Sequence, residues 1–327
     1  MNKLLILFLF FSICASCQET NLISEHGLLE VDGKLIVDKH SEPISVSGPS
    51  LFWGNNGWEG EKYYRESQVK YFREEWNATV IRTAMGVEVK GGYKDDPEGN
   101  MRKVEEVIDA AIKYDMYVIV DFHSHHAEDY QDLALKFFGD LAKKYGAYPN
   151  IMYEIYNEPL QVSWSEVLKP YSLAVIEEIR KHDPDNMVIV GTPNWSQFVD
   201  EAAKDPITEF GNIAYTFHFY AATHKEDLRI RARKAIDAGL PLFFTEWGTI
   251  EANGDGEIDK ESVETWLAFM RENNISHLNW SICDKPEAAS IFQPNIGMKE
   301  SYSDSDLTAS GKYVKSIIQS WNKDIKQ

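Results

Sequence analysis

The 327-residue sequence has few cysteines and few basic residues, and both shortages exclude classes of protein. Its three cysteines are Cys14, Cys17 and Cys283. If Cys14 is removed by processing of the amino terminus and Cys17 is modified, Cys283 is the only free thiol and no internal disulfide can form. The hydrophobic core alone must then stabilise the fold. Lysine and arginine number 33 against 52 acidic residues, a formal net charge of -19. Such a charge repels phosphate backbones, so nucleic acid is not an expected partner, and a neutral or basic substrate suits the chain better.

Long apolar runs are also scarce, and the one present lies at the amino terminus, from Leu4 to Ile13. It is too short to span a bilayer and fits the apolar region of a secretion signal. The small residues Ala15 and Ser16 before Cys17 resemble a bacterial lipoprotein processing site. We therefore expect residues 1–16 to be a signal peptide and the cysteine to be lipidated. The mature protein would be exported to the cell surface or outer membrane, or otherwise secreted, with the membrane a partner only through the lipid.

Residues 17–40 are expected to form a short tether that leads into the first strand. Beyond it, β-rich runs alternate with amphipathic helical patterns, and several runs are apolar without alternation, which is typical of strands covered on both faces. Eight runs begin at Ile44, Ala78, Tyr117, Ile151, Met187, Ile213, Pro241 and Ser276. Eight βα units in roughly 280 residues predict an α/β fold, a single (β/α)8 TIM barrel over residues 41–327. A doubly wound open sheet is the alternative, but it would normally carry a glycine-rich phosphate loop after its first strand.

A TIM barrel carries its functional residues at the carboxyl ends of its strands, and those positions are polar or aromatic in this chain. They are Trp53, Arg82, His123, Asn157, Glu158, Trp195, His218, Tyr220, Glu246 and Trp280. Glu158 follows the fourth run and Glu246 the seventh, so their carboxylates should face each other across the mouth of the barrel. A pair of opposed carboxylates is what glycoside hydrolysis requires.

Six segments carry a family resemblance. They are VIRTAM (80–85), YEIYNEP (153–159), FHFYA (217–221), FTEWG (244–248), NWSICDKPEAAS (279–290) and LFWGNNGWEGEKYY (51–64). Together they resemble glycoside hydrolase family 5, and among its branches they are most similar to the bacterial endo-β-1,4-glucanases, the cellulases. The likeness runs from about residue 44 to the final helix, with the motifs in order.

The resemblance implies a retaining endo-β-1,4-glucanase that hydrolyses internal bonds of cellulose-type glucans by double displacement. Glu158 would be the general acid/base and Glu246 the nucleophile. Tyr220 would contact the nucleophile, and His123 and His218 would line the subsite at the scissile bond.

Electrostatics agrees with these roles. Arg82 is expected to keep Glu246 ionised through charge-assisted hydrogen bonds, whereas Glu158 should be less ionised because Glu246 is a like charge nearby. Asn157 can hydrogen-bond the 2-hydroxyl of the sugar, a contact that strengthens in the transition state.

Tryptophans are expected to bind the sugar rings, because a pyranose presents a face of C–H groups that packs on an indole. Trp280 would form the floor under the sugar that is cleaved, and Trp53 and Trp195 would bind flanking sugars. The resemblance adds Lys285 and Glu287 to the nonreducing-side subsites. Core packing is a stronger interpretation for three further tryptophans, which are Trp58, Trp76 and Trp266.

Three alternatives stay open. The substrate could be another β-1,4-glycan, such as mixed-linkage glucan, xyloglucan or mannan. The protein could be a noncatalytic glycan-binding lipoprotein of the cell surface, although such a protein would be expected to lack one carboxylate. Histidines 123, 125 and 126 invite a metal-dependent hydrolase, but the strand ends offer carboxylates and aromatic rings rather than a converging metal cage. We expect no metal, no cofactor and a monomer.

Overall fold

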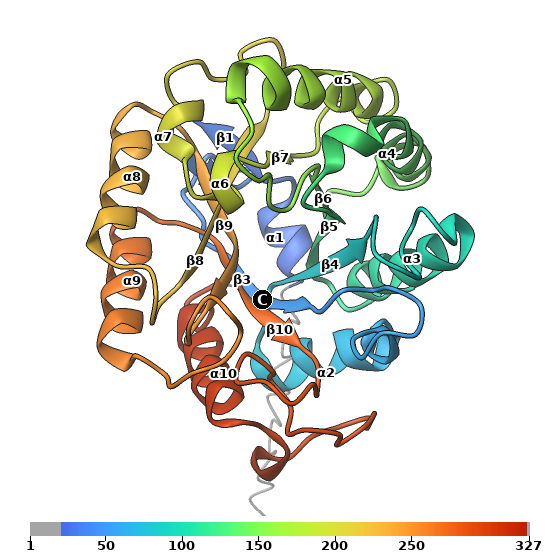
Figure 1. Ribbon diagram of the computed structural model, residues 1–327, viewed down its shortest axis with the longest axis vertical. Helices are drawn as coiled ribbons and strands as arrows, with labels where there is room; N and C mark the ends of the chain where they lie inside the picture. The colour runs from blue at the N-terminus through green and yellow to red at the C-terminus, as the bar shows by residue number, and fades with distance from the viewer. Residues whose placement is uncertain (1–20, 326–327) are drawn as a thin grey trace, which may run out of the picture.

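The computed structural model describes residues 21–325, in which eight parallel strands close into a barrel surrounded by helices (Figure 1). Around the barrel the order is β10-β3-β4-β5-β6-β7-β8-β9. The strands are β3 (Ser47–Leu51), β4 (Val80–Gly86), β5 (Tyr117–His123), β6 (Ile151–Glu154), β7 (Val188–Val190), β8 (Ile213–Tyr220), β9 (Leu242–Gly248) and β10 (His277–Ile282). Each begins within one of the eight predicted runs, so the predicted (β/α)8 barrel is confirmed. The doubly wound alternative is wrong, because β10 pairs in parallel with β3 and leaves no open edge.

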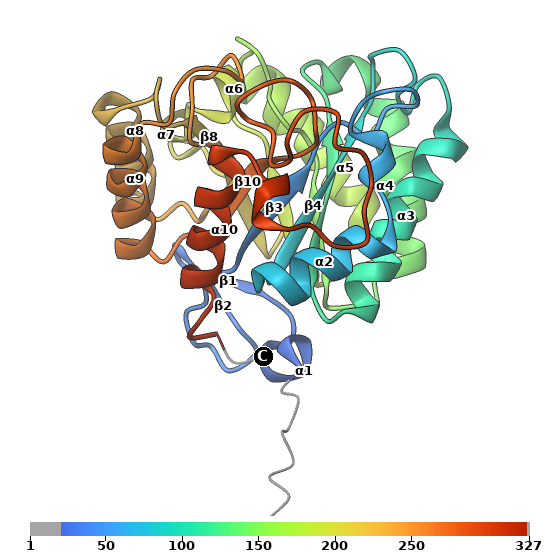
Figure 2. The same cartoon turned by 90° about the horizontal axis from the view of Figure 1, so that it is seen from below.

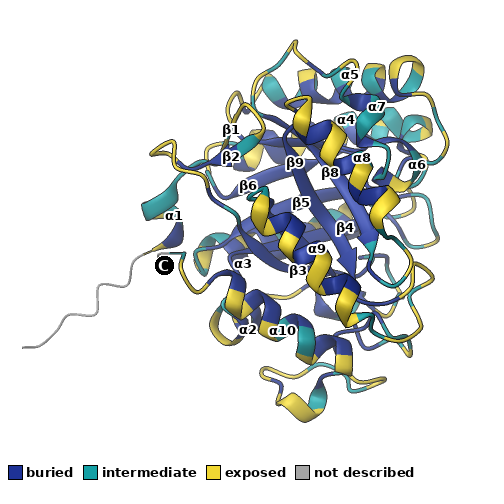
Figure 3. Cartoon of the chain, turned by 90° about the vertical axis from the view of Figure 1, so that its left-hand side faces the viewer, coloured by how far each residue is buried: buried dark blue, intermediate teal, exposed yellow. Residues whose placement is uncertain are grey.

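Helices form the outer layer. They are α2 (Glu66–Trp76), α3 (Pro97–Lys113), α4 (Gln131–Tyr145), α5 (Lys169–Arg180), α6 (Pro193–Ser196), α7 (Val199–Ala202), α8 (Glu226–Asp237), α9 (Lys260–Glu272) and α10 (Ala309–Trp321). Short turns of helix are η1 (Glu61–Tyr63), η2 (Ala127–Tyr130), η3 (Trp164–Leu168) and η4 (Asp304–Asp306). Figure 3 shows the helices buried towards the strands and exposed on their outer faces.

Helix α3 illustrates why these segments are helical. The Asp96 side chain accepts a hydrogen bond from the Gly99 N–H, and Pro97 occupies the first turn, where its missing N–H costs nothing. The apolar stripe that the sequence places at helical spacing is fully buried against the barrel. It consists of Val104, Val107, Ile108 and Ala111.

The barrel interior has two layers with different chemistry, because alternate residues of each strand point inward. The lower layer is apolar and belongs to one buried cluster; from six strands it contains Val80, Ile119, Met152, Ala214, Phe243 and Leu278. The residues two positions further along the same strands form the upper layer, which is mostly polar. They are Arg82, Asp121, Glu154, Thr216, Thr245 and Trp280.

The amino-terminal segment closes the lower end of the barrel, below the strands in Figure 2. Helix α1 (Leu22–His26) and the antiparallel hairpin of β1 (Glu30–Asp32) and β2 (Leu35–Val37) pack there. Leu22, Leu29 and Ile36 are buried in the same cluster as the lower layer, so the described part of the expected tether is folded onto the barrel.

The predicted signal peptide and Cys17 lie outside the described residues. Within residues 21–325, the helices are too short or too polar to cross a membrane.

Candidate active site

The two glutamates singled out from the sequence lie in one cavity at the carboxyl ends of the strands. Glu158 follows β6, Glu246 lies on β9, and one carboxylate oxygen of each comes within 4.8 Å of the other. The cavity has a volume of ≈ 470 Å³. Its lining consists of His125, Glu158, Asn194, Trp195, Gln197, His218, Tyr220, His224, Glu246 and Ala252.

Glu246 is held by two donors. The Tyr220 hydroxyl donates to its Oε1 at 2.7 Å, and Arg82 Nη1 donates to its Oε2 at 3.2 Å. Burial raises the pKa of the Glu246 carboxyl, and the like charge of Glu158 acts in the same direction. His218, Arg82 and Tyr220 oppose this rise. Arg82 thus favours the ionised form of Glu246, as expected, but it does so together with His218 and Tyr220 and against the effect of burial.

Arg82 is shared among three carboxylates. The side chain is fully buried, and its Nε donates to Glu154 Oε2 at 2.6 Å. Its Nη2 lies 2.9 Å from Asp121 Oδ2 and also donates to Asn157 Oδ1 at 2.6 Å. Burial opposes the charge of Arg82, but the surrounding carboxylates outweigh it and raise its pKa. Because Asn157 Oδ1 is engaged by Arg82, its Nδ2 group is left to donate.

Glu158 is bonded to His218, whose Nδ1 lies 2.9 Å from Glu158 Oε1. The other ring nitrogen, Nε2, lies 2.9 Å from the Thr245 hydroxyl, which itself donates to Glu154 Oε1 at 2.7 Å. Because the Thr245 hydroxyl donates its proton to Glu154, it can only accept from His218, so His218 Nε2 carries a proton. The hydrogen bond between His218 Nδ1 and Glu158 Oε1 contains a second proton. Burial opposes a charge on His218, but Glu246 and the bonds to Glu154 and Glu158 raise its pKa to about 9.

Three of the predicted sugar-binding rings surround this centre. Trp280 is 7% exposed and its ring is nearly parallel to His123, with centroids 5.2 Å apart. Trp53 meets His123 edge to face at 4.3 Å. Trp195 is 38% exposed and lines the cavity, and its backbone N–H donates to Pro159 O at 2.8 Å. The structure thus brings all three rings to the same end of the barrel.

Lys285 and Glu287 lie on the rim of the barrel rather than in the cavity of the glutamates. Their side chains form an ion pair of 2.6 Å, and Lys285 Nζ lies 5.4 Å from the centroid of the Phe52 ring.

Of the tryptophans expected to pack in the core, Trp76 and Trp266 are fully buried. Trp58 is partly exposed beside Trp53, so the expectation for Trp58 is wrong.

Comparison with known proteins identifies the family. The model of the family described as Cellulase (glycosyl hydrolase family 5) matches residues 37–286. The chain belongs to this family. It is 50% identical to Endoglucanase Z of Dickeya dadantii over 320 residues, which are 98% of this chain and 73% of that protein. It is 39% identical to an endoglucanase of Clostridium saccharobutylicum over 299 residues, 89% of this chain and 65% of that one.

Solved structures agree with this assignment. A structure from Cytophaga hutchinsonii has 45% sequence identity and a TM-score of 0.90, and the match covers 93% of this chain and 98% of that chain. The catalytic domain of Thermobifida fusca endoglucanase Cel5A has 32% identity and a TM-score of 0.85, with 91% and 99% covered. A variant of that domain has been solved in complex with cellotetraose.

Sequence reasoning missed several residues of this cellulase-family site. Asp121, Glu154 and Thr245 bond Arg82 and His218 from inside the barrel. Each precedes a strand-end residue by one to four positions, and two are charged residues in otherwise apolar runs, which was the available signal. His125 was considered only as a metal ligand, yet its Nδ1 lies 3.6 Å from Glu158 Oε2.

Gln197 and His224 were also missed, because they lie in loops of the cavity wall and not at strand ends. The Tyr220 N–H donates to His224 Nδ1 at 2.8 Å. His224 thus holds the backbone of the residue whose hydroxyl bonds Glu246.

Metal binding by the histidines near 123 has no support in the geometry. His123 Nδ1 is bonded to Asp121 Oδ2 at 2.6 Å, and its ring lies between aromatic neighbours. Within residues 21–325, the group whose ligand atoms converge is Glu158, His218 and Glu246, which is the site described above. Within this group, Glu246 already accepts hydrogen bonds from Arg82 and Tyr220.

Proposed function

We propose that the protein is a retaining endo-β-1,4-glucanase that cleaves internal bonds of cellulose-type glucans. The observation that carries this proposal is the approach of Glu158 and Glu246, whose oxygens come within 4.8 Å. Retaining glycosidases place their two carboxyl groups about 5–5.5 Å apart, whereas inverting enzymes need about 6.5–9.5 Å to admit a water molecule between them. The names of the relatives, all of them endoglucanases, support the substrate class.

Glu246 is the nucleophile in this proposal. Its two oxygens are oriented by the Tyr220 hydroxyl and by Arg82, so that the carboxylate is fixed before substrate binds. It attacks the anomeric carbon and forms a covalent glycosyl-enzyme, which water then hydrolyses.

Glu158 is the general acid and then the general base. In the first step it gives its proton to the glycosidic oxygen, and in the second it takes a proton from the attacking water. His218 Nδ1 lies 2.9 Å from Glu158 Oε1, and this hydrogen bond orients the carboxyl group towards the cavity. Asn157 Nδ2 donates to the 2-hydroxyl of the sugar in the cleaved subsite.

Substitution of each carboxylate tests these roles. Glu158→Ala should lower kcat on soluble cellulose derivatives by about 10²- to 10⁴-fold, the usual contribution of a general acid, and Glu246→Ala should lower it further. On nitrophenyl β-cellobioside, whose leaving group needs no protonation, azide should restore both variants but with opposite stereochemistry, because it attacks the glycosyl-enzyme in place of water in Glu158→Ala and replaces the carboxylate nucleophile in Glu246→Ala. Retained product from the first and inverted product from the second, measured by NMR, is the expected result. Turnover near that of the wild type in either variant would overturn the assignment.

Two further measurements test the substrate and the absence of a metal requirement. When cellulose derivatives, mixed-linkage glucan, xyloglucan and mannan are assayed with one protein batch, kcat/KM should be highest on the cellulose derivatives.

A chelator should leave the activity unchanged, because carboxylates supply both the proton and the nucleophile.

We also propose that the protein is exported, cleaved before Cys17 and lipidated there. The apolar run and the small residues before Cys17 support this proposal. Mass spectrometry of the mature amino terminus tests it, and a chain that still begins at Met1 would contradict it.

A further inference from the structure

A series of aromatic rings leads away from the catalytic centre towards the rim of the barrel. It begins with Trp280 and His123, continues at Trp53 and ends at Trp58. The rings of Trp53 and Trp58 are nearly parallel, with an angle of 18° and centroids 5.6 Å apart. Trp58 is thus the outermost ring of a surface whose inner members surround the reacting sugar.

The loop that carries Trp58 is held in place by the neighbouring β4–α3 loop. Trp58 Nε1 donates to Lys90 O at 3.0 Å, Asn55 Nδ2 donates to Val89 O at 3.0 Å, and Asn56 N donates to Gly91 O at 2.8 Å. Because these bonds exist before any ligand arrives, little conformational entropy would be lost when a sugar packs on the indole.

Gly86, at the end of β4, permits this close packing. A Cβ atom there would lie 1.7 Å from Asn55 Oδ1 and 2.9 Å from the Trp53 ring. The chain thus places Asn55 and Trp53 by a close approach that a larger residue at position 86 would block.

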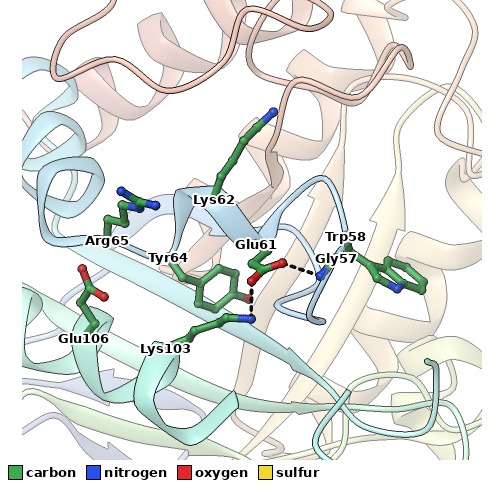
Figure 4. A pocket seen from close by; sticks show the side chains of 8 residues that line it. All are labelled: Gly57, Trp58, Glu61, Lys62, Tyr64, Arg65, Lys103 and Glu106. Atoms are coloured by element: carbon green, nitrogen blue, oxygen red, sulfur yellow. Dashed lines mark hydrogen bonds and ion pairs between the residues drawn. The ribbon is translucent and has the colours of Figure 1, made fainter. Parts of the chain in front are cut away.

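The surroundings of Trp58 are polar but internally neutralised. Figure 4 shows its ring projecting from the Gly57–Glu61 turn on the side opposite to Lys103 and Glu106. Lys103 pairs with Glu61 at 3.0 Å, and Lys62 pairs with Asp284 at 2.5 Å. A cavity of ≈ 530 Å³ lies beside this turn. Paired charges next to an aromatic ring suit a neutral ligand rich in hydroxyl groups.

The neighbours of Trp58 on the rim of the barrel indicate which end of a bound glucan would lie beside its ring. Lys62, four residues after Trp58, bonds Asp284, which directly precedes Lys285. Lys285 and Glu287 are the rim residues expected on the nonreducing side, and Trp195 lies in the cavity of Glu158 and Glu246 instead. With Lys285 and Glu287 on the nonreducing side, as the resemblance implies, the aromatic series extends on that side as well.

We propose that Trp58 forms an additional sugar-binding subsite beyond Trp53, at the nonreducing end of the bound chain, for a neutral β-1,4-linked glucan. This proposal rests on the function proposed above. Its role is binding: the ring adds affinity for longer chains and does not take part in the chemical step.

The test uses nitrophenyl β-glycosides of cello-oligosaccharides of increasing length, with nitrophenol release as the readout. Release requires the whole glucan to lie on the nonreducing side, so each added sugar probes one subsite further out. In wild-type protein kcat/KM should rise until the sugar that reaches Trp58 is added. In Trp58→Ala the last increase should be lost, a drop of about tenfold for the long glycosides, which corresponds to about 1.4 kcal/mol. The cellobioside should react at the wild-type rate.

Two variants serve as controls. Trp58→Phe keeps an aromatic face and should recover most of the loss. Tyr148→Ala removes an aromatic side chain that is 43% exposed at the start of β6, at the opposite end of the barrel, and should leave every ratio unchanged.

The outcomes separate the possibilities. Equal rates for Trp58→Ala and the wild type at all lengths would overturn the proposal. So would an equal loss at all lengths, because Trp58 would then act only by supporting Trp53. If wild-type protein hydrolyses none of these glycosides or cello-oligosaccharides, the proposed function itself is wrong, which is a different result from either of these.

Discussion

The lower and upper layers of the barrel interior are built by the same strands, yet they stabilise the molecule in different ways. In the lower layer, side chains such as Ile119 and Phe243 are fully buried in an apolar cluster. Two residues further along the strands, Arg82, Asp121 and Glu154 are equally buried but carry ionisable groups. Over a rise of two residues along each strand, about 7 Å, the interior thus changes from apolar side chains to a network of ion pairs and hydrogen bonds.

The difference shows where the fold gains stability and where it gives some up. Buried apolar area is favourable by roughly 25 cal/mol per Å², whereas buried charges must recover a desolvation cost that their mutual attraction does not always exceed. Two carboxylates of the upper layer, Asp121 and Glu154, surround the guanidinium of Arg82, and Glu246, the next residue after Thr245 on β9, is the third. What this arrangement provides is two glutamates, the proposed nucleophile and the proposed acid, that are fixed in position before substrate binds.

The largest effect is expected from Arg82→Leu. The substitution leaves Asp121, Glu154 and Glu246 buried without their counter-charge, so the free energy of unfolding should fall by about 3–5 kcal/mol. Activity of the folded fraction should fall with it, because Glu246 loses one of its two donors. Denaturant unfolding and kcat/KM on cello-oligosaccharides measure both changes.

Arg102→Leu is the matched control for this prediction, because the Arg102 side chain is 70% exposed on α3. Its effect on stability should stay within about 0.5 kcal/mol. An Arg82 variant as stable and as active as this control would show that the upper layer does not depend on its central cation.

The contrast between the layers also explains how much could be predicted from the sequence. The strand number and the positions of Glu158, Glu246 and Tyr220 were predictable, because parallel strands are apolar runs and their last residues lie at one end of the barrel. Asp121 and Glu154 were not, since a charge inside an apolar run has meaning only once the closed barrel shows that the strands share one interior.

Trp58 was assigned to the core for a related reason. Its exposure depends on how the loop after β3 packs against the loop after β4, through Asn55, Lys90 and Gly86, and no periodic pattern encodes a contact between two loops. The raised pKa of Glu246 likewise depends on its burial and on the nearby charge of Glu158, which only the packed interior shows.

The next largest effect concerns pH. The pKa of His218 is raised to about 9 in the folded protein, above its ordinary 6.5, so protonation of His218 stabilises the fold below pH 6.5. This contribution should be lost as the pH rises through about 9, and the loss should amount to about 3 kcal/mol. Unfolding by denaturant at intervals across this range measures it. His218→Gln should lack this decline, and an equally steep decline in that variant would assign it to another group.

The smallest effect is expected in the lower layer, from Ile119→Val. The substitution removes one methylene from a fully buried side chain and should lower the free energy of unfolding by about 0.5–1.5 kcal/mol. Because Ile119 belongs to the apolar cluster and not to the ion network, kcat/KM and its pH dependence should be unchanged.

Thr245→Val is the matched change in the upper layer. It leaves the His218 Nε2–H without its acceptor, which should lower the free energy of unfolding by about 1–3 kcal/mol. It should also alter the pH profile of kcat/KM. If Ile119→Val also shifts the pH profile, the two layers are coupled, and the lower one contributes to positioning Glu158 and Glu246 as well as to stability.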